Sequence, residues 1–137
     1  MSLNTARTNI FGHIVSNWSA CPVLYQGQKI TDTYIKKRTP WMYVNLVWDT
    51  HQQQSMAAPE AYFATLGIIA VKLYVRENAG AAVMDTLTDN LFSLFRLQQI
   101  NNVTITEMNI DNDDYSKGWN VRSVSISFIL RTMEEIA

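Results

Sequence analysis

The segment from Trp41 to Trp48 constrains the fold most, because its apolar residues recur at every second position. One set of alternate side chains is entirely apolar: Met42, Val44, Leu46 and Trp48. The other set is mixed: Trp41, Tyr43, Asn45 and Val47. A period of two is that of a β-strand, whose successive side chains point to opposite faces. The segment is therefore predicted to be a strand whose fully apolar set faces a core.

Further segments carry the same signal. Tyr62–Arg76 alternates over most of its length, and Gly67 within it indicates a bulge. The remaining strands are expected at Val23–Gln26, Val103–Ile110 and Val121–Arg131. The alternation is lost near Glu107, which predicts a bulge or a sheet edge there. The last strand has one face of mostly serine, so that face is expected to be half wet or to contact another subunit.

Two segments have the three-and-four spacing of helices with one buried face. The first spans Asn4–Trp18, with Asn4 or Thr5 as its cap. The second begins after a cap at Asn78 and runs to about Leu97, with Asp85 and Asp89 on its wet side. The apolar positions of the two helices are Ala6, Ile10, Phe11, Ile14, Val15 and Trp18, and Val83, Met84, Leu87, Leu91, Leu94 and Phe95.

Three polar stretches lack either period: Gln28–Thr39, Asp49–Glu60 and Asp111–Gly118. The first is expected to be an exposed basic connection that ends at Pro40. The second is rich in glutamine and supplies little apolar area, so it is predicted to be a long mobile loop. The third is predicted to be an acidic loop.

The order of these elements indicates an α+β fold: one mixed, mainly antiparallel β-sheet with two α-helices packed on a face. A strand-helix-strand crossover is expected in the second half of the chain. The 137 residues fit one compact domain, residues 1–137, and the sequence contains no internal repeat or linker.

The composition argues against several classes of function. The net charge is -1, which gives no positive field for non-specific nucleic-acid binding. The single cysteine, Cys21, has no partner for an internal disulfide. Met1–Arg7 is polar, and the longest apolar run, Leu66–Val71, is too short to cross a bilayer, so we expect a protein that is neither secreted nor embedded in a membrane. Charged residues make up only 17% of the chain, a low value that hints at self-association.

Catalytic chemistry has little support in the sequence. His13 is expected to be a surface residue of the first helix, and His51, beside Asp49, falls in a loop that holds no fixed geometry. Cys21 lacks a basic neighbour and is expected to be a buried, inert thiol. The acidic loop lacks the glycine and glutamate of an EF-hand calcium site, so we expect a solvated turn. The sequence therefore predicts no enzyme, no catalytic residue, no metal and no cofactor.

The sequence favours a function in binding other proteins over a function in catalysis. The chain offers a basic run, partly exposed tryptophans at two strand starts, and an amide-rich loop. The candidate contact residues are Lys36, Lys37, Arg38, Trp41, His51, Gln52, Gln53, Gln54, Met56, Arg76, Trp119 and Arg122.

Several short motifs in this element order resemble a known family. They are Thr5-Ala6-Arg7-Thr8-Asn9-Ile10-Phe11, Pro22-Val23-Leu24-Tyr25, Pro40-Trp41-Met42-Tyr43-Val44 and Gly67-Ile68-Ile69-Ala70-Val71-Lys72-Leu73-Tyr74. With the helix that follows, they are similar to the tail terminators of long-tailed bacteriophages, a family of ring-forming minor tail proteins that join tail to head. The similarity spans nearly the whole chain.

The resemblance implies an α+β subunit that assembles in the host cytoplasm into a ring, usually a hexamer, at the head-proximal end of the tail. Such a ring ends tube polymerisation and presents the surface for head attachment. Its partners would be copies of itself, the tail tube protein, a head completion or connector protein and the tape-measure protein, with no membrane and no specific nucleic acid. Two alternatives remain open: a neck, head-completion or tail-tube subunit, and a monomeric ligand-binding adaptor with Gln52–Pro59 as a lid.

Overall fold

The computed structural model describes residues 3–27, 40–57, 60–96 and 99–135, with residues 50–57, 60–63 and 132–135 described by their backbone path only. In chain order the elements are α1 (Leu3–Asn17), β1 (Val23–Tyr25), β2 (Trp41–Ala57), β3 (Glu60–Arg76), α3 (Ala81–Phe95), β4 (Gln99–Ile100), β5 (Val103–Ser116) and β6 (Trp119–Glu135).

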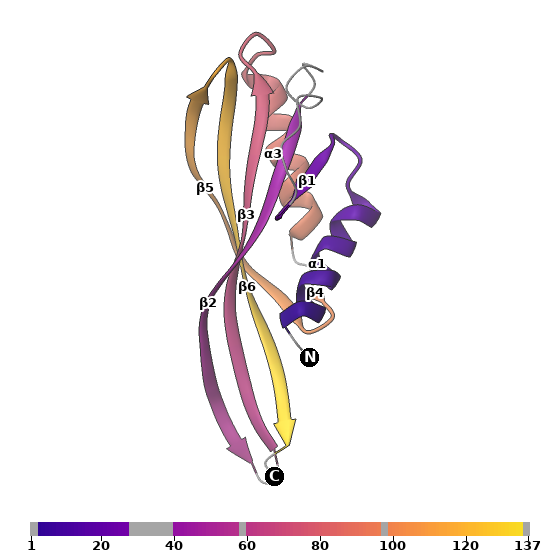
Figure 1. Ribbon diagram of the computed structural model, residues 1–137, viewed down its shortest axis with the longest axis vertical. Coiled ribbons are helices and arrows are strands. Elements are labelled where there is room, and N and C mark those ends of the chain that lie inside the picture. The colour runs from indigo at the N-terminus through magenta and orange to yellow at the C-terminus, as the bar shows by residue number, and fades with distance from the viewer. Residues whose placement is uncertain (1–2, 28–39, 58–59, 97–98, 136–137) are drawn as a thin grey trace.

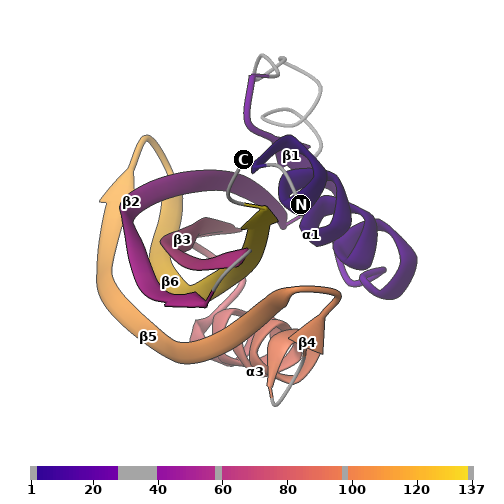
Figure 2. The same cartoon turned by 90° about the horizontal axis from the view of Figure 1, so that it is seen from below.

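The described strands form one mixed sheet of six, in the order β1-β2-β3-β6-β5-β4. β1 pairs with β2 in parallel, and every other neighbouring pair is antiparallel. With two helices, this is the expected α+β class. The sheet is a curled half-barrel rather than a flat layer, as the view from below shows (Figure 2).

The core lies between the sheet and the two helices (Figure 1). Ile10 and Ile14 of α1 and Leu91 of α3 belong to the same buried cluster as the inward side chains of the strands. Those inward residues include Met42, Val44 and Leu46, Ile69, Val71 and Leu73, and Val124, Ile126 and Phe128. The faces predicted for these strands from their alternation are therefore confirmed.

The long strands extend well beyond their apolar stretches, and this corrects two predicted loops. Residues expected to form a mobile loop from Asp49 to Glu60 instead continue β2 to Ala57, and β3 begins at Glu60. Residues 111–116 of the predicted acidic loop belong to β5, and only Lys117 and Gly118 turn the chain, with φ of 50° and 88°. Backbone pairing with β3 and β6 explains both results, because a ladder of hydrogen bonds forms without an apolar face.

Smaller corrections concern bulges and a cap. The register shifts of the β2–β3 pair lie in β2, between Trp48 and His51 and between Gln53 and Ser55, rather than at Gly67 of β3. The shift predicted near Glu107 is confirmed between Ile105 and Glu107. Gly80, with φ of 91°, precedes α3 at the cap position where Asn78 was expected.

Candidate assembly surfaces

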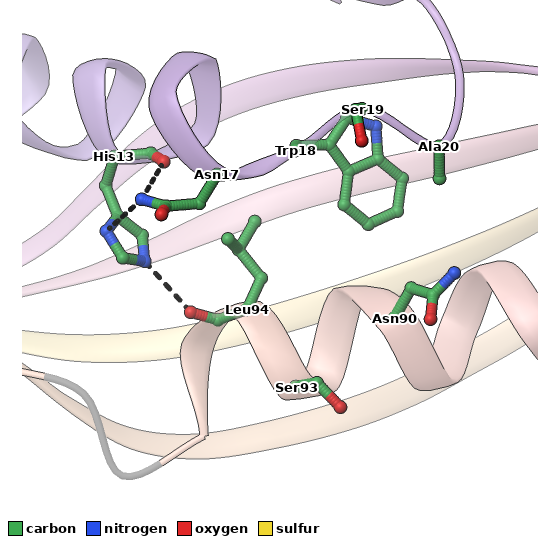
Figure 3. A pocket seen from close by; sticks show the side chains of 8 residues that line it. All are labelled: His13, Asn17, Trp18, Ser19, Ala20, Asn90, Ser93 and Leu94. Carbon is green, nitrogen blue, oxygen red and sulfur yellow. Dashed lines mark hydrogen bonds between the residues drawn. The ribbon is translucent and has the colours of Figure 1, made fainter.

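His13 ties the two helices together. Its Nε2 lies 2.9 Å from the carbonyl oxygen of Leu94, at the end of α3, so a neutral ring with its proton on Nε2 donates to that carbonyl. The side-chain amide of Asn17 lies 3.3 Å from His13 Nδ1 and donates to the His13 carbonyl at 2.9 Å. Figure 3 shows these three contacts. The expectation of a plain surface histidine is therefore corrected, because both ring nitrogens make structural contacts.

A groove lies beside this histidine, between α1 and α3 (Figure 3). Its volume is about 560 Å³, and it is open to solvent. The lining residues are His13, Asn17, Trp18, Ser19, Ala20, Asn90, Ser93 and Leu94. None of them is a carboxylate, a cysteine or a lysine, and the histidine is engaged with Leu94. Among these lining residues, His13 is the one titratable side chain, and its Nε2 lies 2.9 Å from the Leu94 carbonyl oxygen.

Cys21 is half-buried, and burial raises the pKa of its thiol to about 11. Its carbonyl oxygen accepts a hydrogen bond of 3.1 Å from Nε1 of Trp18. A thiol with so high a pKa stays protonated at neutral pH and is a poor nucleophile. This supports the inert role expected from the sequence.

The acidic residues of β5 form a side-chain network rather than an ion site. Arg122 of β6 donates to Asp113 through Nε at 2.7 Å, and to Asp85 of α3 through Nη1 at 2.9 Å. Nη1 also donates to the hydroxyl of Thr88 at 3.0 Å. The hydrogen bond from Arg122 lowers the pKa of Asp113. Within the described part of the chain, no group of three or more His, Cys, Asp or Glu residues could hold a metal ion.

Arg122 thus joins α3, β5 and β6 at one end of the sheet. The side chains of its two ion-pair partners, Asp113 and Asp85, are largely exposed, whereas the arginine side chain is only 14% exposed. An arginine held by two carboxylates in one chain is committed to internal structure. Its expected role as a free contact residue is therefore not supported by its surroundings.

The two tryptophans expected at strand ends are interior residues. Trp41 and Trp119 are only 3% and 5% exposed, and they pack with Leu24 and Val121 in a second apolar cluster. The Trp41 ring stacks on Tyr74 with 3.9 Å between centroids. Arg76 lies over the Trp119 ring, with its Cζ 4.3 Å from the centroid. The partial exposure expected for these tryptophans is not found, because together they close a cluster of their own.

The remaining candidate contact residues lie elsewhere. Lys36, Lys37 and Arg38 fall outside the described residues. His51, Gln52, Gln53, Gln54 and Met56 lie on β2, paired with β3 rather than in a loop.

Two long strand edges are the surfaces that sequence reasoning missed. β4 pairs only with Val103 and Thr104 of β5, so no described strand pairs with the outer edge of β5 from Ile105 to Ser116. β1 pairs with β2 only over Met42–Val44, and Gln26 Oε1 accepts from the backbone N–H of Leu46 at 3.1 Å. Within the described residues, β2 therefore has an open outer edge from Val47 to Ala57.

Exposed apolar side chains accompany these edges. Ile110 and Tyr115 of β5 are 49% and 56% exposed, and Val47 of β2 is 44% exposed. The sequence does contain one indication that β5 is a strand: the turn residues Lys117 and Gly118 stand directly before Trp119, where β6 begins. A tight turn predicts a hairpin, and a hairpin requires β6 to have a partner strand upstream of the turn.

Comparisons with known proteins add a likeness of fold. No family model matches the chain, and neither does any curated protein. A solved structure is similar over 95% of this chain and 96% of that chain, with a TM-score of 0.65 and 13% sequence identity. At that identity the likeness concerns the fold alone. No helix within the described residues is long and apolar enough to span a membrane.

Proposed function

We propose that this protein is a non-enzymatic structural subunit that caps the tail tube of a long-tailed phage as a ring, ends tube polymerisation and forms the surface for head attachment. The observation that carries the proposal is the pair of long open edges on one sheet, of which one belongs to β2 and the other to β5. Open edges offer rows of backbone donors and acceptors to another chain. Two different surfaces on one subunit are what a head-to-tail ring contact needs.

The side-chain chemistry supports the same proposal. The polar contacts of His13 and Arg122 connect elements of the fold, and burial keeps the Cys21 thiol protonated. The His13 and Arg122 side chains are therefore engaged in contacts within the subunit. The adaptor alternative loses its lid, because Gln52–Ala57 is strand.

Tube growth in vitro tests the proposal. The purified chain is added to polymerising tube protein encoded in the same genome, and tube lengths are measured by electron microscopy while light scattering gives the mass of the chain alone. We expect closed rings at tube ends and tubes that stop growing. Equal tube lengths with and without the chain would contradict the proposal. Polymerisation of the chain itself into long tubes would favour the tail-tube alternative.

A further inference from the structure

The open edges of β2 and β5 differ in chemistry. From Ile105 to Ser116, β5 carries Glu107, Asp111, Asp113 and Asp114 and no lysine or arginine. From Val47 to Ala57, β2 carries Asp49 as its only carboxylate and is rich in glutamine. Ionised carboxylates only accept hydrogen bonds, whereas glutamine amides also donate them.

This difference decides which edges suit one another. Arg122 offsets the charge of Asp113, but two β5 edges side by side would still bring Glu107, Asp111 and Asp114 together across strands as like charges, which is destabilising. A β5 edge beside a β2 edge avoids that repulsion, because the open segment of β2 carries a single carboxylate, Asp49. We propose that the open edge of β5 docks on the open edge of β2 in a second copy of this chain, so that the sheet continues from subunit to subunit. The inference rests on the proposed function and names its contact.

Strand direction is consistent with such a junction. β2, β3, β6 and β5 are neighbours in this order, and each pair is antiparallel, so β2 and β5 of one copy also run antiparallel. Copies related by rotation around a ring keep one orientation along the axis. β5 of one copy therefore meets β2 of the next in antiparallel fashion, which is the pairing used by the rest of the long strands.

The positions of the two open edges determine how far neighbouring copies must be displaced along the strands. Trp48, Gly67, Phe128 and Ile105 form one row across the sheet, and the open segments extend from that row in opposite directions (Figure 1). Side-by-side pairing thus needs a displacement along the strands. The proposed junction requires strands that tilt to the ring axis in the sense that brings the two segments together. At a tilt of about 45°, as in closed barrels, four strands about 4.8 Å apart displace consecutive copies by about 19 Å along the strands, or about six residues. A displacement of that size is sufficient to bring much of the two segments together.

Mixed cross-linking tests the junction, because the chain has only one native cysteine. In a Cys21→Ser background, one batch carries Ile110→Cys on β5. The other batches carry one cysteine on β2, by His51→Cys or Gln53→Cys, because the register places these positions, opposite Thr65 and Phe63, on the same face of the sheet as Ile110. Val47→Cys lies on the opposite face, so it is the control that should not cross-link to Ile110→Cys. Because Ile110 and Val47 are half exposed, these two substitutions leave the core untouched. Each batch is oxidised alone and after mixing, and light scattering records the mass of each sample.

We expect mixing to give on the order of tenfold more disulfide dimer than either batch alone, at one or two neighbouring β2 positions, because assembly holds the paired thiols at high effective concentration. Efficient dimers of the Ile110→Cys batch alone would overturn the inference in favour of β5 pairing with itself. A multimer by light scattering without mixed disulfide at any β2 position would also overturn it, and would leave the proposed ring function standing. A monomer at every concentration would count against both.

Discussion

The phenyl ring of Phe128 on β6 occupies the space directly over Gly67 on β3. A β-carbon at position 67 would lie 2.4 Å from Cζ of Phe128, closer than any real contact. The two residues are direct partners across the strand pair, and Trp48 on β2 packs edge-on against the same ring, with 5.5 Å between centroids. A glycine is therefore required here by packing, not by its backbone angles.

The first prediction concerns this contact. Gly67→Ala should destabilise the protein by about 1–3 kcal/mol, because the surrounding core has to shift to admit a methyl group. Gly12→Ala is the matched control, since a β-carbon there meets nothing within 4 Å and alanine favours the helix. Urea unfolding measures both. Equal stability of Gly67→Ala and the wild type would show that Phe128 moves aside without cost.

A second prediction tests the core faces of the central strands. Val44→Asp and Leu73→Asp should each prevent folding, because both side chains are fully buried and an unpaired charge there costs several kcal/mol of a total stability of about 5–15 kcal/mol. Val15→Asp on the exposed side of α1 is the control and should fold normally. Circular dichroism on heating distinguishes them. A cooperative transition near the wild-type temperature for either strand variant would mean that the face is misassigned.

The third prediction follows from the Cys21 thiol, whose pKa rises from 9.0 to about 11 on folding. The folded state holds this proton more tightly, so the stabilisation is complete below pH 9 and is lost as the pH rises towards 11. Between pH 9 and pH 11 the free energy of unfolding of the wild type should fall by up to about 2–3 kcal/mol more than that of Cys21→Ser. Urea unfolding at several pH values measures the difference. Parallel stability curves for the two proteins would contradict the burial of the thiol.

A fourth prediction uses the Arg122 network. The pKa of Asp113 is lowered in the folded state. Its contribution to the free energy of unfolding is therefore present above the unfolded-state pKa of 3.8, and it is lost as the pH falls through the folded-state pKa. The pair is exposed on its aspartate side, so Asp113→Asn should cost at most about 1 kcal/mol at pH 7. The difference in free energy of unfolding between the variant and the wild type should disappear at acidic pH. A gap that persists at pH 2 would indicate a packing effect of the substitution instead.

Part of this structure followed from local sequence. Helix α1, the short strand β1 and the inward faces of the long strands were predicted, because burial imposes a period on the residues that line a core. The α+β class follows from the order of those elements. The raised pKa of the Cys21 thiol agrees with the inert thiol that was predicted, because the residues beside it offer no positive charge.

Tertiary structure alone decided the rest. Residues 49–57 and 111–116 are strand because neighbouring strands satisfy their backbone groups, and such pairing leaves no apolar period in the sequence. His13 and Leu94 are far apart in the chain, so only the packing of α1 on α3 brings them within 2.9 Å. Trp41 and Trp119 lie on the face opposite the main core, and only the curl of the sheet and the meeting of β1, β2, β3 and β6 bury them together. Local sequence shows which side chains are apolar enough to be buried, whereas the residues that pack and pair with them come from distant parts of the chain.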